Sequence, residues 1–540
     1  DKSRKLLFAL SELSYFTAKQ FSSREYYLTS AIYSYLYLFG DGNADPLNPY
    51  DRRFRVASDL YNIGLAKASE IAQDSEVEGS SRITPESGTL ELPMGQMKVE
   101  VSRPGFPWGK ERFAGFLPAD AFEVHGLSVR TRVPGLGVPL IAIQTPPKER
   151  KKVSEDDYLG PTLKLPATAF VRIRGGVCEM GSENFSASLE IYSPFDVSEI
   201  QVGNRKVPLE TDLTAPLAYS LEGSVLWDFE LGGFFSGGQK LVKTGLYMVQ
   251  PYQREKIPVV FVHGTASSPA RWAEMFNTLQ GDQDIRERFQ FWAFIYTTGN
   301  PIAYSASLLR DSLKKVVNAL DPNGDDQALK QMVVIGHSQG GLLTKMMVIE
   351  SGNKFLDNLG VKSIEELGLT GDESEILRRS LLFEPLPFVR RVVFIATPQR
   401  GSFIAGNWIG QLGAKLISMP TNVVKLTTHV FAKIVVPPWL KGRVPSSVDN
   451  MSPGHPFIKT LGSIPVAPDV KEHSIIAVKG EGNPEKGNDG VVEYSSAHIK
   501  GADSELVVRS GHSVQSNPLA IGEVRRILLE HKREYRKHRK

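Results

Sequence analysis

The sequence predicts an α/β protein whose C-terminal half is a mainly parallel β-sheet with helices on both faces. From about residue 255 onward, short β-branched or aromatic runs alternate with segments of helical periodicity, which is typical of strand–helix–strand units. A Gly-x-Ser-x-Gly sequence lies between one of those strands and a helix. The first 250 residues are helical at first and then β-like, which predicts that they fold separately.

The length and composition exclude several classes of protein. At 540 residues the chain is longer than one ordinary domain and predicts about three to four units. Apolar residues make up 41% and charged residues 23%, which excludes collagen-like and largely disordered chains. The formal net charge is only +3, so nucleic-acid binding is not expected. Because Cys178 is the single cysteine, no disulfide can form within the chain.

The two ends of the sequence bear on where in the cell the protein is expected. The first residue, Asp1, is not a methionine, so an exported or cell-envelope protein whose leader has been removed is compatible with this chain. The stretch KREYRKHRK at 532–540 either lies on an anionic membrane surface or partner, or is a solvated helix end. The compartment and the oligomeric state stay open at this level.

The N-terminal half divides into three predicted regions. Residues 1–75 are expected to form a helical hairpin or a small helical layer, whose apolar stripe, including Leu13, Phe16, Ile32 and Tyr35, should pack into a core; contact with a lipid surface is the alternative. Residues 76–160 are punctuated by Gly, Pro and charge, which predicts an extended linker. Residues 161–250 contain short alternating runs between turns, which predicts a small antiparallel, sandwich-like β domain.

The C-terminal half is predicted to be one domain over 251–525, followed by a basic tail at 526–540. Strands are expected at 258–262, 289–296, 332–335, 391–396, 474–478 and 506–508. Since helical segments separate them, these strands should run parallel.

The clearest chemical motif is Gly336-His337-Ser338-Gln339-Gly340. It follows the predicted strand 332–335 and precedes a helix with apolar periodicity. Glycines on both sides allow a tight, strained turn that presents the hydroxyl beyond the sheet. Ser338 is therefore the predicted nucleophile, and a glycine-rich turn with an incidental serine is the alternative.

Residues 251–525 resemble the α/β-hydrolase superfamily, in particular bacterial true lipases and esterases and the lipase-like group that includes GPI-inositol deacylases. The resemblance is carried by the segments VVFVHGTASSPARW, VVIGHSQGGLL, VVFIATPQRGS, NDGVV and GHS. It implies the α/β-hydrolase fold and hydrolysis of carboxylic esters, lipids included, through an acyl-enzyme. The first 250 residues carry no such motif.

A serine hydroxyl becomes a useful nucleophile when a histidine removes its proton and a carboxylate orients that histidine. His512 lies between the last predicted strand and the final helix, so it is the expected base, with His498 as the alternative. The acid matching the Asn-Asp-Gly-x-Val pattern of lipases is Asp489, with Glu481 as the substitute.

The resemblance also implies an oxyanion hole. The sequence His263-Gly264-Thr265 follows a predicted strand and is similar to the His-Gly loop of these lipases. The backbone amides of Thr265 and Gln339 are therefore expected to face the oxyanion that develops on the substrate.

The chain between the nucleophile and the acid is longer than the fold needs, which predicts insertions at about 351–388 and 403–445. The second is expected to be a lid whose apolar face covers an acyl pocket and favours lipid or long-chain esters. A fixed helical cap over a smaller ester site is the alternative. The substrate-binding residues expected on the lid are Trp408, Ile409, Leu412 and Leu416.

Other functions receive less support. The pairs Gly232-Gly233 and Gly237-Gly238 lack the spacing that cradles phosphates, and the histidines lack metal-ligand spacing, so neither a cofactor nor a metal is expected. An acyltransferase would use the same three residues, and no feature favours a peptidase or thioesterase. A catalytically silent scaffold that binds a partner through the N-terminal half is the alternative from another class.

Overall fold

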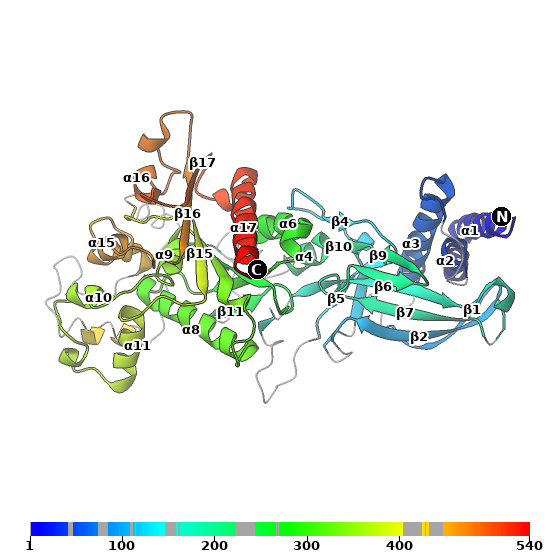
Figure 1. Ribbon diagram of the computed structural model, residues 1–540, viewed down its shortest axis with the longest axis horizontal. Coiled ribbons are helices and arrows are strands. Elements are labelled where there is room, and N and C mark those ends of the chain that lie inside the picture. The colour runs from blue at the N-terminus through cyan, green and yellow to red at the C-terminus, as the bar shows by residue number, and fades with distance from the viewer. Residues whose placement is uncertain are drawn as a thin grey trace. The chain divides into compact units, whose positions relative to one another are not determined.

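The computed structural model divides the chain into two compact units (Figure 1). Unit 1 comprises Asp1–Lys151 and Pro161–Ser224, and unit 2 comprises Lys152–Gly160 and Val225–Lys540. None of the described helices is both long enough and apolar enough to span a bilayer. The residues that the structure describes are 2–40, 47–73, 85–108, 112–113, 115–145, 158–159, 163–182, 184–221, 244–265, 267, 269–402, 424–426, 428–430 and 446–539.

Unit 1 begins with three helices, one more than the predicted hairpin: α1 (Lys2–Phe21), α2 (Arg24–Phe39) and α3 (Arg52–Gln73). Ser23 starts α2 because its side chain accepts a hydrogen bond from the Tyr26 amide, an N-cap contact. Gly40, with a φ of 63°, ends the same helix.

In helix α1 the predicted burial of Leu13 and Phe16 is wrong, whereas Ile32 and Tyr35 of the same predicted stripe, in α2, are buried in the core. Leu13 and Phe16 are 63% and 64% exposed. Ser11 is fully buried instead, and its hydroxyl donates to the Ser30 carbonyl and bonds to the Ser34 hydroxyl at 2.5 Å. The two helices therefore pack through both serine hydrogen bonds and apolar contacts such as that of Leu7, and a search for apolar periodicity overlooks the serines.

A six-stranded sheet forms the rest of unit 1, in the order β1-β2-β7-β6-β5-β3. All neighbours are antiparallel except β2 and β7, which run parallel. The strands are β1 (Gly88–Leu92), β2 (Gly95–Gly105), β3 (Gly115–Pro118), β5 (Val138–Ile143), β6 (Lys164–Arg174) and β7 (Ser186–Tyr192). Two-stranded pairs join β4 (Arg132–Val133) to β10 (Thr211–Asp212) and β8 (Glu199–Val202) to β9 (Arg205–Pro208), and α4 (Thr214–Leu221) follows.

The structure differs from the predicted linker at 76–160, because four strands of this sheet lie in that range. The predicted sandwich at 161–250 is also corrected, since its strands β6 and β7 join the same sheet, and helices α2 and α3 pack on that sheet. Tyr61 of α3 anchors the two layers, because its hydroxyl donates to the Val171 carbonyl and accepts from the Val171 amide.

Unit 2 is built on a seven-stranded sheet in the order β11-β13-β12-β14-β15-β16-β17. The strands are β11 (Gly245–Met248), β12 (Ile257–Val262), β13 (Phe289–Ile295), β14 (Met332–His337), β15 (Val389–Ile395), β16 (Lys471–Val478) and β17 (Ser504–Arg509). The six predicted strands are confirmed and run parallel. The seventh, β11, pairs antiparallel with β13, so the predicted domain boundary at 250 falls too late.

Helices lie on both faces of this sheet, and unit 2 has the α/β-hydrolase fold (Figure 1). The helices are α6 (Ala273–Gly281), α7 (Gln283–Arg286), α8 (Ile302–Leu320), α9 (Gln339–Lys345), α10 (Lys354–Asp357), α11 (Gly371–Leu381), α14 (Ser447–Asn450), α15 (Pro456–Ser463), α16 (Tyr494–Ala497) and α17 (Pro518–Arg539). The core strands are fully buried, as expected for a parallel sheet covered on both sides.

The basic tail predicted at 526–540 is corrected, because this segment continues helix α17 and packs on unit 2. Lys532 and Tyr535 are each 5% exposed. The Lys532 ammonium donates to the carboxylate and carbonyl oxygens of Asp284 in α7. The charged and apolar residues of 526–539 therefore belong to the two faces of the amphipathic helix α17.

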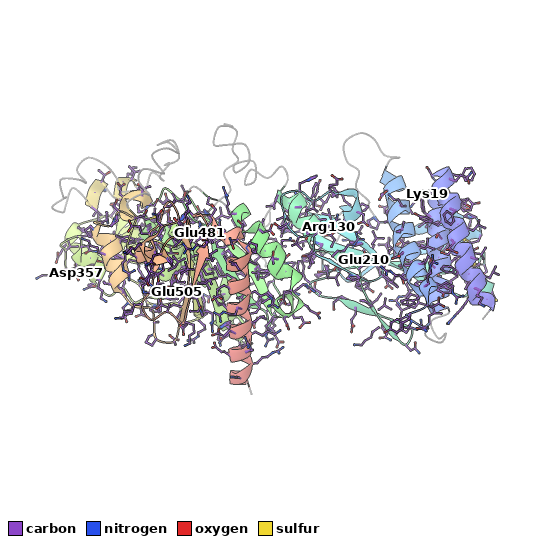
Figure 2. All side chains as sticks on the ribbon, turned by 90° about the horizontal axis from the view of Figure 1, so that it is seen from above. Lys19, Arg130, Glu210, Asp357, Glu481 and Glu505 are labelled. Carbon is purple, nitrogen blue, oxygen red and sulfur yellow. The ribbon has the colours of Figure 1, made fainter. Side chains whose placement is uncertain are left out.

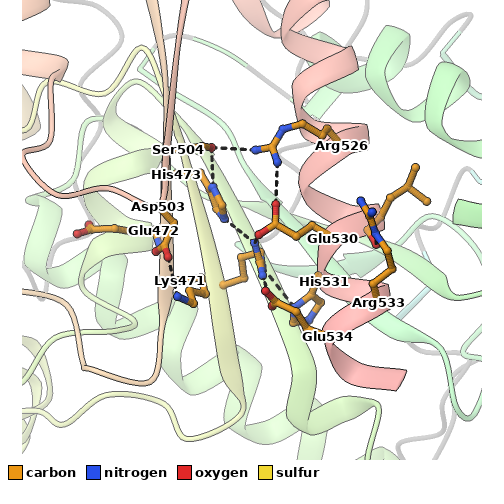
Figure 3. Close-up of polar contacts among 12 residues, drawn as sticks. Lys471, Glu472, His473, Asp503, Ser504, Arg526, Glu530, His531, Arg533 and Glu534 are labelled. Carbon is orange, nitrogen blue, oxygen red and sulfur yellow. Dashed lines mark hydrogen bonds and ion pairs between the residues drawn. The ribbon is translucent and has the colours of Figure 1, made fainter. Parts of the chain in front are cut away.

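Helix α17 is joined to the sheet by a buried polar network around Arg391 of β15. The Arg391 guanidinium bonds to His473 Nε2 at 2.7 Å, to His531 Nδ1 at 3.3 Å and to Glu534. Figure 3 shows the neighbouring contacts, in which the Ser504 hydroxyl joins His473 to Arg526. Burial, followed by the charge of Arg391, lowers the pKa of His473 and His531 to about 4.

This network predicts that unit 2 loses stability in mild acid. The two imidazoles are neutral in the folded chain down to about pH 4 but titrate near 6.5 when unfolded, so the unfolded state binds more protons between these values. The free energy of unfolding should therefore fall as pH drops from about 6.5 to 4, by roughly 3 kcal/mol for each imidazole. Urea unfolding at pH 7 and pH 4.5 measures this loss.

The His531→Gln variant retains an N–H donor for the Gln331 carbonyl, which His531 Nε2 reaches at 2.8 Å. It should lose less stability between the two pH values than the unmodified chain, because one titrating group is gone. His498→Gln is the control, since His498 is exposed. An equal loss in both variants would assign the acid sensitivity to other groups.

Candidate active site

The predicted nucleophile occupies a strained turn between β14 and α9. Ser338 has a φ of 53° and a ψ of −125°, a backbone conformation that side-chain-bearing residues rarely adopt. The turn is held because the Ser338 amide donates to the Ile395 carbonyl of β15 at 2.9 Å. The residue is 6% exposed. The side chain thus sits just beyond the carboxyl end of the central strand.

Two glycines bring the loop after β12 against this turn. A Cβ added at Gly264 would lie 2.8 Å from the Ser338 Cβ and 3.1 Å from the His337 carbonyl oxygen. A Cβ added at Gly340 would collide with the carbonyls of Val262 and His263. Only glycine fits at either position, which explains the motif on steric grounds.

The three side chains predicted as nucleophile, base and acid lie in a hydrogen-bonded row. His512 Nε2 is 2.9 Å from Ser338 Oγ, and His512 Nδ1 is 2.7 Å from Asp489 Oδ2. The three residues follow β14, β16 and β17, whose carboxyl ends meet at one edge of the sheet. The side chain of His512 is 12% exposed, so one edge of the row can reach a ligand.

Asp489 is held so that only one of its oxygens is free for the histidine. Its Oδ1 accepts hydrogen bonds from the amides of Val491 and Val492, each at 2.7 Å. The residue is 1% exposed. The two amide donors hold Oδ1 in place, and Oδ2 is left pointing at the imidazole of His512.

The two residues predicted for the oxyanion hole, Thr265 and Gln339, are joined by a hydrogen bond between their side chains. The Thr265 hydroxyl donates to Oε1 of the Gln339 side chain, and Nε2 of the same side chain donates to the Thr298 carbonyl at 3.1 Å. Gln339 is also the first residue of α9, where a backbone N–H has no acceptor within the helix. These side-chain links, which have no signal in the motif, fix the backbone on which both predicted donors sit.

His263, at the start of the same loop, is a structural residue. Its ring stacks on Tyr296, and the Tyr296 hydroxyl donates to the His263 carbonyl at 2.9 Å. Burial lowers the pKa of His263 to about 4. The neutral ring therefore positions the loop backbone.

His337 is a site residue that the motif contained but whose role was not predicted. Its Nε2 donates to the carbonyl oxygen of His512 at 2.8 Å, and the two ring centroids are 4.9 Å apart. Burial, followed by the charge of His512, lowers the pKa of His337 to about 3. A neutral ring bonded in this way anchors the loop that carries His512.

The hydrogen-bonded row contains neither His498, the alternative base, nor Glu481, the alternative acid. His498 Nδ1 bonds to Glu505 at 2.7 Å, and its ring stacks on Tyr494. Glu481 is exposed on the loop after β16 (Figure 2).

The predicted lid at 403–445 falls almost wholly outside the described residues, including Trp408, Ile409, Leu412 and Leu416. Leu426 and Val430, which are described, pack against the insertion at 351–388 through residues such as Leu367. That insertion contains helices α10 and α11. In the part of the chain that the structure describes, no group of three His, Cys, Asp or Glu residues is placed to hold a metal ion.

Comparison with known proteins finds similarity in solved structures only. No protein-family model and no curated protein matches the chain. The mature lipase BlEst2 from Bacillus licheniformis aligns with 53% of this chain and 97% of its own, at 15% identity and a TM-score of 0.32. EstA from Clostridium botulinum aligns with 49% of this chain and 84% of its own, at 12% identity and a TM-score of 0.31.

A carboxyl esterase from a metagenome aligns with 53% of this chain and 71% of its own, at 17% identity and a TM-score of 0.27. The fold of unit 2 is assigned from its own strand order, with one antiparallel edge strand and a serine turn after the central strand β14.

Proposed function

We propose that the chain is a serine hydrolase that cleaves carboxylic esters, with Ser338 as nucleophile, His512 as base and Asp489 as the orienting acid. The single observation that carries this proposal is the row of two hydrogen bonds, 2.9 Å and 2.7 Å, that joins the three side chains. Serine, histidine and carboxylate in this order and spacing are the groups that acyl transfer through a serine needs.

The geometry suggests how each group acts. As Ser338 Oγ attacks the carbonyl carbon of the ester, His512 Nε2 takes its proton, and Asp489 stabilises the imidazolium that forms. The oxyanion is stabilised by the backbone amides of Thr265 and Gln339, which sit on the loops joined by the Thr265–Gln339 hydrogen bond. His512 then protonates the departing alkoxide, and water attacks the acyl-enzyme by the same steps in reverse.

We extend the proposal to lipid or long-chain esters. The resemblance of the motifs to true lipases and to GPI-inositol deacylases favours such substrates, as does the apolar composition of the predicted lid at 403–445. Because a lid that lines an acyl pocket adds contact with each methylene, the preference should be visible as a dependence on acyl length.

Hydrolysis of p-nitrophenyl esters from acetate to palmitate tests both levels. We expect turnover of the series, with kcat/KM rising from acetate to acyl chains of at least eight carbons, at roughly 0.8 kcal/mol of binding for each buried methylene. An optimum at acetate would keep the hydrolase and reject the lipid-sized pocket. No turnover of any ester would reject the hydrolase, and ester products formed with an added alcohol would identify an acyltransferase instead.

His337 is expected to act as a positioning residue through its bond to the His512 carbonyl. Replacing it by leucine removes the donor, so kcat should fall about tenfold while KM stays unchanged, because one hydrogen bond contributes on the order of 1 kcal/mol. His337→Gln keeps an N–H donor and should restore most of the lost kcat. Equal losses in both variants, accompanied by a lower melting temperature, would reduce the role of His337 to packing.

A further inference from the structure

Unit 1 contains a cavity of about 330 Å³ that lies between helices α2 and α3 and the six-stranded sheet. Its helical wall includes Leu28, Ile32 and Leu65, and its sheet wall includes Met97, Val171 and Leu189. The volume is about twice the 150 Å³ that suffices for a benzene-sized guest and lies within the range of ligand pockets.

The cavity persists because small side chains stand where large ones would fill it. Ala31 and Ala68 line it from the helices and Ala169 from the sheet. Protein interiors are otherwise close-packed, and a void of this size loses the contacts that its wall atoms would make. An apolar guest restores those contacts, whereas water gains few hydrogen bonds from such walls.

The rim of the cavity is polar and reaches the surface at Glu86, Gly88 and Thr89. Arg24 also lines the rim, and its Nε atom is buried without a hydrogen-bond partner among the described residues. A buried guanidinium N–H is costly to leave unpaired, and a carboxylate matches its planar fork better than any neutral group. The site thus joins an apolar chamber to one cationic donor.

We propose that this cavity binds the acyl chain of a fatty acid, with the carboxylate at Arg24. An anionic amphiphile satisfies both halves of the site, because the chain fills the apolar chamber and the head group pairs with the guanidinium. Glu86 lines the same rim, and its negative charge repels the carboxylate of the ligand, so removing that charge should tighten binding of the anion. The site lies wholly in unit 1, so the proposal does not rest on Ser338 or on ester hydrolysis.

Calorimetric titration of the full chain with dodecanoate, and with the neutral 1-dodecanol, tests the proposal. The protein carries Ser338→Ala and is compared with the unmodified chain treated with a fluorophosphonate, so that binding in unit 2 is recognised. We expect saturable binding of one dodecanoate after fluorophosphonate treatment, and a further equivalent that appears only with Ser338→Ala is binding in unit 2. Arg24→Met should weaken dodecanoate binding on the order of tenfold and leave dodecanol within twofold, whereas Glu86→Gln should tighten dodecanoate binding.

Filling the cavity supplies the positional control. Leu189→Trp and Val99→Trp place an indole in the chamber from two different strands, so one variant serves if the other fails to fold. With Ser338 retained, each should abolish binding of both ligands after fluorophosphonate treatment and, before treatment, leave thermal unfolding and the rate of ester hydrolysis unchanged. Absence of saturable binding, binding that survives both tryptophans in folded protein, or equal dodecanoate affinity in Arg24→Met would overturn the proposal.

Discussion

Replacing Ser338 by alanine should lower kcat for p-nitrophenyl esters by about a million-fold. The side chain supplies the atom that becomes acylated, and the substitution removes the hydroxyl that His512 Nε2 activates from 2.9 Å away. The residual rate should come from the oxyanion donors alone. Initial rates with p-nitrophenyl butyrate, measured at matched protein concentration, give the ratio.

Ser513→Ala is the matched control, since Ser513 is exposed beside His512 on the same loop. It should keep kcat within twofold of the unmodified chain. If Ser338→Ala retained more than about one per cent of the activity, the nucleophile would be a different group and the proposed mechanism would fail.

The second large effect is expected from Asp489→Asn, with kcat falling about ten-thousand-fold. The reason lies in the two amides of Val491 and Val492, which both donate to Asp489 Oδ1. An asparagine keeps its oxygen toward these donors, so its NH2 group faces His512 Nδ1. The imidazole must then place its proton on Nε2, where it cannot accept the proton of Ser338.

Glu481→Gln is the control for this prediction, because Glu481 is the alternative acid and is an exposed carboxylate on the same loop after β16. The kcat of the Glu481→Gln variant should be unchanged. The melting temperature of the Asp489→Asn variant should stay close to that of the unmodified chain. A mild effect of Asp489→Asn together with a severe effect of Glu481→Gln would exchange the two roles.

The arrangement of unit 2 could be predicted from sequence because each parallel strand is a continuous apolar run. The run at 332–335 became β14, and the glycines around Ser338 indicated the turn that follows it. The strand β11 was misplaced because its few residues have the same pattern as the strands of unit 1. Its pairing with β13 depends on a contact across 40 residues or more, which a local pattern does not contain.

Unit 1 was harder to predict for two physical reasons. Helix α1 buries Ser11 and exposes Leu13 and Phe16, so its packing face combines hydrogen bonds between serines with the apolar contact of Leu7. In the range predicted as a linker, β2 alternates between buried and exposed positions, but its charged residues and prolines concealed that alternation. Periodicity predicts structure well only where burial of apolar side chains decides the packing.

The supporting contacts of the site were likewise out of reach of the motif. His337 bonds to a carbonyl 175 positions away, and Thr265 bonds to a side chain 74 positions away. Such contacts exist only when the loops have been brought together by the sheet. Sequence patterns identify the reacting side chains because the chemistry fixes their types, whereas many residue types can hold them in place.

The most direct test of the central claim is mass spectrometry of the chain after treatment with a fluorophosphonate that phosphonylates activated serines. We expect one adduct, on the peptide that contains Ser338. In His512→Ala the reaction should slow by several orders of magnitude, because the base that lies 2.9 Å from the hydroxyl is gone. An unlabelled Ser338 in folded protein, or labelling that proceeds equally fast without His512, would contradict it.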